Sequence, residues 1–301
     1  MPSIDDRCSL RSLAAGESLA GTASTIRHWL LIEHPGPWGR DGLLDARLPE
    51  GLGRDLRALE SRTGARVLLI RRPDRKAEYG QGVFCCAVDT RDAWMGFQVL
   101  DGIDESALLD PRERGAFFDR EGEPLFVVCT HGRRDPCCAE RGRPLAEAAA
   151  AVGRDVAWES THVGGDRFAG NVVAFPHGLY FGRVEPGEVA DLMRAYDQGR
   201  ISPLHRYRGR SCDPFPVQAA EHAVREHLGG LDLVDDVHRL RVDLRTAEIH
   251  VVFATPTGPF LVRLKSVPGA PMRLTCHATF EETRREWRVL GIERDPPDAV
   301  P

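Results

Sequence analysis

The chain has 301 residues, which suits two or three domains better than one. Apolar residues make up 42% and charged residues 28%, the balance of a globular protein with a sizeable core, so disordered and fibrous proteins are excluded. No uncharged apolar run approaches the ~18 residues of a membrane helix, and residues 1–7 lack the basic and apolar segments of a secretory signal. A net charge of −5 argues against binding to nucleic acid or to acidic membranes. We therefore expect a cytoplasmic protein with no nucleic-acid or membrane partner.

Residues 1–110 are predicted to form an N-terminal α/β lobe. The apolar pattern indicates a strand, a helix and three further strands, in that order, over residues 25–33, 52–62, 67–70, 82–88 and 93–100. Gly64 follows the helix at a position where helices commonly end. This order resembles that of the next lobe, so a second thioredoxin-like lobe is one interpretation. Residues 101–124 are rich in charged residues and glycine, and we expect a linker with a short helix near 106–109.

Residues 120–205 are predicted to form a thioredoxin-like domain. The pattern indicates a strand, a helix, a strand, two hairpin strands and a closing helix, over residues 125–128, 144–152, 156–158, 172–176, 179–184 and 186–197. The first strand carries Cys129 to its C-terminal end, where α/β sheets hold their ligands. The first helix has Pro144 at its start and Gly153 at its end. Strand–helix–strand followed by strand–strand–helix is the thioredoxin-like order.

Residues 206–301 are predicted to form a C-terminal lobe with one helix and a small sheet. The helix is expected at 216–228, and strands within 240–254 and at 260–267. The whole chain is therefore predicted to be an α/β (α+β) protein. Its thioredoxin-like domain is flanked by the N-terminal α/β lobe and by this helix-plus-small-sheet lobe.

Two loops of the central domain combine metal-binding side chains. The first reads Cys129-Thr-His-Gly-Arg-Arg-Asp-Pro-Cys-Cys138, and the second reads Ser160-Thr-His-Val-Gly-Gly-Asp-Arg-Phe-Ala-Gly-Asn171. Two of the three residues between His162 and Asp166 are glycines, which argues against a helix and predicts a loop that wraps around something. Two thiolates, an imidazole and a carboxylate would make a four-ligand metal set. The alternative interpretation is a buried polar corner without a metal.

These loops resemble those of the sucrase/ferredoxin-like family of thioredoxin-fold [2Fe–2S] proteins. The family motifs read roughly C-S/T-H-x-x-R-D-x-x-C and S/T-H-x-G-G-H/D-R-F-x-x-N, and the likeness extends to residues 30–38, 68–73 and 176–184, with a weaker echo at 210–212 and 218–221. The resemblance implies a ferredoxin domain whose cluster has two Cys ligands on one iron and a pair of His ligands on the other. By position, Cys129, Cys138 and His162 match these ligands.

The fourth ligand is open, because Asp166 stands where the family pattern has a second histidine. A carboxylate is a harder ligand than imidazole or thiolate and suits an iron–sulfide cluster less well. Cys137 is the substitute ligand, and His131 is a third candidate. An ion pair with a neighbouring arginine is the alternative role of Asp166, and buried packing is that of Cys137.

Other residues of the two loops are expected to support the site. Asp135 and Asn171 are predicted to brace the loops by hydrogen bonds. Arg134 and Arg167 are expected to donate hydrogen bonds toward the cluster, to pair with Asp166, or to contact a redox partner protein. The remaining five of the eight cysteines are interpreted as core packing: Cys8, Cys85, Cys86, Cys212 and Cys276.

The leading hypothesis is one-electron transfer by a [2Fe–2S] cluster, with an unidentified redox protein as partner. We expect an electron carrier rather than a substrate-converting enzyme, and we assign no catalytic residue. The second hypothesis is a Zn²⁺-binding structural or regulatory module, because zinc accepts Cys, His and Asp ligands together. The third is a cysteine redox sensor that uses Cys137 and Cys138.

Overall fold

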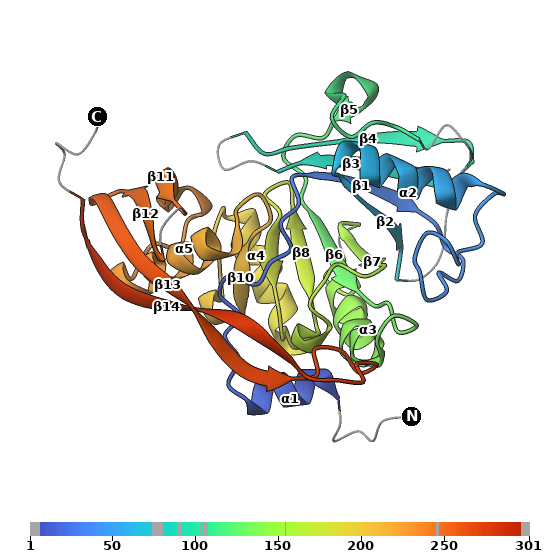
Figure 1. Cartoon of the computed structure of the whole chain (residues 1–301). Coiled ribbons are helices and arrows are strands. Elements are labelled where there is room, and N and C mark those ends of the chain that lie inside the picture. The colour runs from blue at the N-terminus through green and yellow to red at the C-terminus, as the bar shows by residue number, and fades with distance from the viewer. Residues whose placement is uncertain are drawn as a thin grey trace.

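The computed structural model describes residues 7–73, 81–88, 92–102, 104, 108–153, 155–244 and 247–295. A ten-stranded mixed sheet and a four-stranded antiparallel sheet make up its framework, with helices packed against both (Figure 1). The expected mixed α+β class is confirmed. Within the described ranges, no helix is both long and apolar enough to cross a membrane.

The first unit of the large sheet is a strand–helix–strand motif followed by two more strands. They are β1 (His28–Glu33), α2 (Leu52–Thr63), β2 (Arg66–Arg71), β3 (Gln81–Ala87) and β4 (Trp94–Leu100). β1 is parallel to β2 and antiparallel to β3, which pairs with β4, so the spatial order is β2-β1-β3-β4. Gly64 ends α2 in the left-handed conformation (φ 70°), as its position predicts.

The second unit repeats this order. It comprises β6 (Leu125–Cys129), α3 (Pro136–Ala150), β7 (Ala157–Ser160), β8 (Val172–Phe175), β9 (Leu179–Phe181) and α4 (Val189–Asp197). β6 is parallel to β7 and antiparallel to β8, and β9 follows, so the spatial order is β7-β6-β8-β9. This is the thioredoxin arrangement. The units join where β2 and β7 run antiparallel, with Ile70 opposite Ser160.

The two units also pack against each other through the sheet faces that carry no helix. The Trp29 ring of β1 lies 5.3 Å from the Phe175 ring of β8, and the Phe84 ring of β3 lies 5.6 Å from the Trp158 ring of β7. In Figure 1 α2 lies against the first unit, and α3 and α4 lie against the second. The core between the units also contains Cys129.

Short elements complete the large sheet and its connections. The edge strands are β5 (Phe118–Asp119) beside β4 and β10 (Tyr207–Arg210) beside β9. Helix α1 (Cys8–Ala14) precedes β1. Single 3₁₀ turns lie at Arg114–Ala116, Asp166–Phe168, Pro186–Glu188, Leu204–Arg206 and Val234–Asp236.

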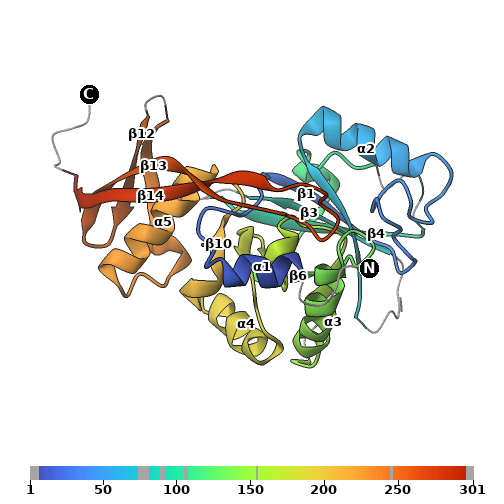
Figure 2. The ribbon, with the colours of Figure 1, turned by 60° about the horizontal axis from the view of Figure 1, so that its bottom comes forward.

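The C-terminal lobe packs helix α5 (Phe215–Leu228) on the small sheet. Its strands are β11 (His238–Asp243), β12 (Glu248–Thr255), β13 (Gly258–Met272) and β14 (Glu282–Arg294), paired in sequence order. β13 and β14 are much longer than their neighbours and form an arm. Figure 2 shows this arm reaching back from the lobe to α1 and α3.

Three sequence predictions differ from the structure. The helix expected to begin at Pro144 begins at Pro136, because Asp135 caps it and Pro136 fits its first turn. Residues 207–210, assigned to the C-terminal lobe, pair with β9 and extend the large sheet. The strand at Glu282–Arg294 had no predicted counterpart. The short helix expected near 106–109 falls largely outside the described residues.

Candidate metal centre

The first site loop is short because α3 starts early. β6 ends at Cys129, and Asp135 accepts a hydrogen bond from the Cys137 N–H at 2.9 Å, which caps the helix. Cys137 and Cys138 therefore lie on the first helical turn and point about 100° apart. The expectation that only loop joins Cys129 to Cys138 is wrong for Pro136 and Cys137, which belong to α3. Consecutive helical positions send the two neighbouring thiols to different places.

The second site loop turns sharply at two glycines. Gly164 and Gly165 have φ angles of +102° and +81°, a region that residues with a Cβ rarely adopt. His162 precedes this turn, and Asp166 follows it. Their side chains meet, with His162 Nδ1 3.0 Å from Asp166 Oδ1.

The two loops bring together the four residues that the motif analysis selected. The ligand atoms of Cys129, Cys138 and His162 all lie within 4.8 Å of one another. The Cys138 thiol donates to Asp166 Oδ1 at 3.1 Å. Three of these side chains are buried, and that of His162 is 23% exposed. The group therefore lies inside the protein, with one imidazole at the surface.

The charges of this group depend on each other. The hydrogen bond from Cys138 lowers the pKa of Cys129 and raises that of Cys138, so the group favours one thiolate and one thiol. Burial is the largest influence on His162 and opposes its protonated form, but the close contacts with Asp166 and Cys129 together outweigh it and raise the pKa of His162 to about 9. Burial likewise opposes the Asp166 carboxylate, and its contact with His162 lowers the Asp166 pKa overall.

The donor atoms suit a metal centre. Two sulfurs and one imidazole nitrogen match the ligand types of iron–sulfur clusters and of zinc, and zinc also accepts a carboxylate oxygen. The buried His162 Nδ1 makes no well-formed hydrogen bond to any residue in the described part of the chain, although it lies close to Asp166. A buried nitrogen without a hydrogen bond destabilises the folded protein unless another partner, such as a metal ion, binds it.

Cys137 does not belong to this group. Its Sγ lies 3.6 Å from Cys8 Sγ and 3.4 Å from Cys276 Sγ, in a separate group of thiols. The structure therefore does not place Cys137 with Cys129, Cys138 and His162. Cys8 and Cys276 pack against Cys137 in a small buried cluster, in line with their interpretation as core packing. Cys212 and Cys86 are buried in the core between the two units, and the side chain of Cys85 lies outside the described part of the chain.

His131, the third candidate for the fourth ligand, lies beside the group rather than in it. Its Nε2 is 3.0 Å from the carbonyl oxygen of Gly39, and its ring packs edge-on against Trp38. Its backbone N–H donates toward Cys129 and lowers the pKa of that thiol. His131 thus links the site to a loop of the first unit.

Buried hydrogen bonds hold the second site loop. Asn171 donates to the Gly165 carbonyl at 2.9 Å and accepts from Arg208 Nη1 at 2.7 Å. The guanidinium of Arg208, which is 1% exposed, also donates to the Gly164 carbonyl at 3.1 Å. Sequence analysis missed Arg208, which is distant in sequence and lies in no motif. A Cβ on Gly165 would come within 2.5 Å of Arg208, so this support requires glycine there.

The two arginines of the motifs lie differently. Arg167 donates to both oxygens of Glu17, at 2.9 and 3.1 Å, and so is not paired with Asp166. Arg134 is exposed, and its positive charge helps to lower the pKa of Asp166. Asp135 caps α3 and accepts a second hydrogen bond, from the Cys276 N–H at 2.7 Å.

A surface cavity of about 720 Å³ opens beside His162. His131, Thr161 and His162 line it, and Thr161 forms hydrogen bonds with Leu69 of the first unit. Four arginines and two acidic residues also line it: Arg40, Asp41, Arg57, Glu60, Arg66 and Arg134. The buried group therefore meets solvent at a mainly basic opening.

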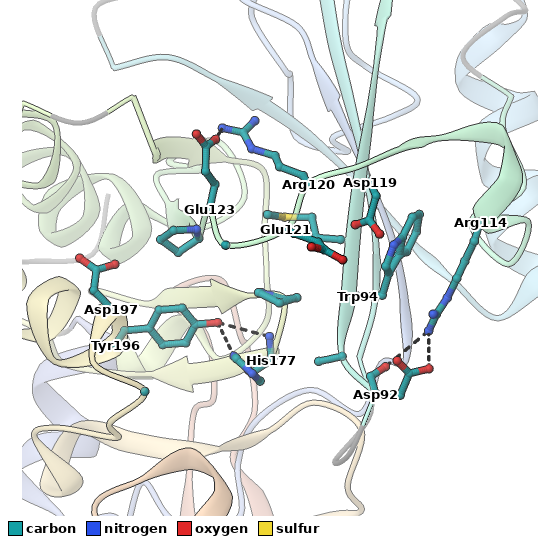
Figure 3. A pocket seen from close by; sticks show the side chains of 16 residues that line it. Asp92, Trp94, Arg114, Asp119, Arg120, Glu121, Glu123, His177, Tyr196 and Asp197 are labelled. Carbon is teal, nitrogen blue, oxygen red and sulfur yellow. Dashed lines mark hydrogen bonds and ion pairs between the residues drawn. The ribbon is translucent and has the colours of Figure 1, made fainter.

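Another cavity, of about 790 Å³, lies between the β4–β5 region and α4 (Figure 3). In it the Tyr196 hydroxyl lies 2.7 Å from His177 Nδ1, and Arg114 pairs with Asp92. Burial lowers the pKa of His177 to about 4. None of the residues of the two site loops lines this cavity.

Comparison with known proteins gives one family. The sequence profile of the family described as "Sucrase/ferredoxin-like" matches residues 19–209. The chain is 32% identical over 97 residues to altered inheritance of mitochondria protein 32 of Meyerozyma guilliermondii. That match covers 29% of this chain and 34% of the other, so the chain spans about a third of the length of this curated relative.

Among solved structures, the chain is similar to a thioredoxin-like [2Fe–2S] ferredoxin from Aquifex aeolicus. The identity is 17% and the TM-score 0.28, over 31% of this chain and 96% of that one. A cysteine-to-serine variant of the same protein gives 20% identity and a TM-score of 0.25, over 28% and 96%. The thioredoxin arrangement described above rests on strand order and direction, not on these scores.

Proposed function

Because the chain belongs to the sucrase/ferredoxin-like family, we propose that it is a one-electron carrier with a [2Fe–2S] cluster held by Cys129, Cys138, His162 and Asp166. One observation carries the proposal. Two loops that follow the ends of the parallel strands β6 and β7 bring two sulfurs, a nitrogen and a carboxylate oxygen to one buried point.

The family pattern implies which two side chains bind each iron. Cys129 and Cys138 would hold one iron, and His162 and Asp166 the other. A bound [2Fe–2S] cluster supplies reversible one-electron chemistry. Asp166 adds a negative charge that a histidine would not, and this favours the oxidised state. The N–H of His131, directed at Cys129, works in the opposite direction because it stabilises negative charge on the sulfur.

The position of His162 supports an electron path to a partner protein. Its imidazole is the part of the group that reaches the surface, and the exposed side chains of Arg40 and Arg134 border the opening there. We propose that a redox protein with an acidic face binds at this opening. Electrostatic attraction of this kind mainly increases association rates and weakens with salt.

Zinc is the second candidate, because the observed donor set also suits one four-coordinate Zn²⁺. The redox-sensor hypothesis has less support, since Cys137 and Cys138 are adjacent in sequence but belong to different side-chain groups.

Metal content and electron paramagnetic resonance (EPR) test the proposal on the purified full chain. We expect a red-brown protein with equal amounts of iron and acid-labile sulfide, and an EPR signal after one-electron reduction. Cys129→Ser should lose the colour, whereas Cys212→Ala, a buried cysteine outside both thiol groups, should keep it. A colourless protein that loses zinc upon Cys129→Ser would refute the cluster and establish the zinc site.

A further inference from the structure

We propose that Cys8, Cys137, Cys276 and Asp135 form a second metal site, suited to Zn²⁺, that fastens α1 and the arm to the first turn of α3. Three segments far apart in sequence contribute to it. Cys8 begins α1, Cys137 lies on α3 next to its cap Asp135, and Cys276 lies in the connection between β13 and β14. This site shares no side chain with the proposed cluster.

The three sulfurs form a nearly equilateral triangle. The Sγ–Sγ distances are 3.6 Å for Cys8–Cys137, 3.4 Å for Cys137–Cys276 and 3.6 Å for Cys276–Cys8. A tetrahedral zinc with bonds of about 2.3 Å places its sulfur ligands about 3.8 Å apart. A disulfide brings two sulfurs to about 2.05 Å and would leave the third thiol alone. The observed triangle resembles one face of a metal-centred tetrahedron.

Asp135 completes the donor set. Both of its carboxylate oxygens lie 3.8 Å from Cys8 Sγ. One oxygen accepts from the Cys137 N–H at 2.9 Å and the other from the Cys276 N–H at 2.7 Å. The carboxylate is thus held in place by the backbone of two of the cysteines it accompanies. Ligating carboxylates typically have such additional hydrogen bonds.

Burial and charge favour a cation at this point. Cys8, Cys137 and Asp135 are each at most 1% exposed, and only Cys276 is partly exposed. A carboxylate beside three thiols has a strong electrostatic cost in a buried place unless positive charge balances it. The N-terminus of α3 supplies a partial positive charge. The Ser9 hydroxyl also donates a hydrogen bond to Cys137 Sγ at 3.3 Å. A divalent cation would supply the rest and let all three thiols bind as thiolates.

Zinc analysis of the full-length chain and three variants provides the test. We expect about one zinc per chain in the wild type, as for a closed structural site. Cys8→Ser, Cys276→Ser and Cys137→Ala should each lose that zinc and keep the red-brown colour. Cys212→Ala, the matched control, should keep both. Unchanged zinc content in Cys8→Ser and Cys276→Ser would overturn the proposal.

Alkylation measured by mass spectrometry keeps the proposal testable if a variant fails to fold. In the native wild type, Cys8, Cys137 and Cys276 should react with N-ethylmaleimide only after a zinc chelator is added. Equal labelling of the partly exposed Cys276 with and without chelator would overturn the site. So would a disulfide between any two of the three thiols in untreated protein. Both outcomes are independent of the proposed cluster, because the two sites share no side chain. The cluster has its own test, the colour of Cys129→Ser.

Discussion

Asp166 stands where the resemblance implies a second histidine ligand, and the structure shows what its carboxylate touches. It lies between His162 Nδ1 at 3.0 Å and Cys138 Sγ at 3.1 Å. A neutral histidine at this position would lack the negative charge. The choice of residue here therefore changes the charge of the site while preserving its position.

Replacing that carboxylate should shift the reduction potential of the proposed cluster. We expect Asp166→His to raise the potential, because a neutral ligand favours the oxidised state less. A potentiometric titration followed by EPR measures the shift. Asp191→Asn, an exposed acid on α4, is the control and should leave the potential unchanged. An unchanged or lower potential in Asp166→His would contradict a ligand role for Asp166.

His177 should make the protein less stable in acid. Burial lowers its pKa to about 4, so the unfolded chain takes up a proton below about pH 6.5 while the folded protein does not. The free energy of unfolding therefore falls as the pH drops from about 6.5 to 4, by up to about 1.4 kcal/mol per pH unit. His177→Gln should flatten this slope in denaturant titrations, whereas the exposed His227→Gln should not.

Single residues also mark the limit of what the sequence could predict. Cys129, Cys138, His162 and Asp166 stand in two recognisable motifs, so their convergence could be expected. The group around Cys137 could not, because Cys8 and Cys276 lie in no motif and approach α3 only when the chain is folded. Residue type alone favours buried packing for an isolated cysteine.

At the scale of elements, the early start of α3 directs Cys138 toward Cys129 and His162, and Cys137 toward Cys8 and Cys276. Its strongest signal was Asp135-Pro136, a capping residue followed by a proline suited to the first turn. Pro144, the start that the sequence analysis predicts, lies inside the helix. Strand and helix order in the two units followed from apolar periodicity. The length of β13 and β14 did not, because most residues of β14 are exposed or half-buried and show no apolar alternation.

The contact between α3 and β6 should be sensitive to one added methyl group. A Cβ on Gly142 would come within 2.0 Å of the Cys129 carbonyl oxygen, which is backbone and cannot turn aside. We expect Gly142→Ala to push α3 from β6, separate Cys138 from Cys129, and lower iron content several-fold. Iron per folded chain measures this.

A matched glycine provides the control for that experiment. Gly187 has no atom within 4 Å of the same added methyl group, so Gly187→Ala should retain full iron content. Normal iron content in Gly142→Ala would contradict the close packing of α3 on the end of β6.

At the scale of the whole molecule, two units with the thioredoxin strand order share one sheet and enclose a common core. The repeated order of elements suggested this likeness, but nothing in the sequence indicated that β2 and β7 would pair. Such edge-to-edge pairing depends on backbone groups, which every residue carries. The joining of the units places the first unit's Gly39 against His131 beside the candidate metal centre.

Local and overall charge make opposite predictions for electron exchange. The chain has a net charge of −5, yet the opening beside His162 has more basic than acidic residues. If electrons leave there, oxidation by anionic hexacyanoferrate(III) should slow as salt is added, because salt screens attraction. Stopped-flow absorbance of the reduced protein measures this rate.

Reversing one charge at the opening tests whether the basic residues there cause the salt dependence. Arg134→Glu should weaken or reverse the salt dependence, whereas Arg194→Glu, at an exposed position on α4, should not. Faster oxidation of the wild type with added salt would show that the net charge governs the encounter and that electrons leave elsewhere.

The arm also imposes an order on biosynthesis. The ribosome completes Cys129, Cys138, His162 and Asp166 well before it reaches Cys276. At roughly 5–20 residues per second, the delay between Asp166 and Cys276 is on the order of ten seconds. Until then the site of Cys8 and Cys137 lacks its third thiol, while all four proposed cluster ligands have already been synthesised. The proposed cluster can thus assemble before the β13–β14 hairpin delivers Cys276 and completes the proposed zinc site.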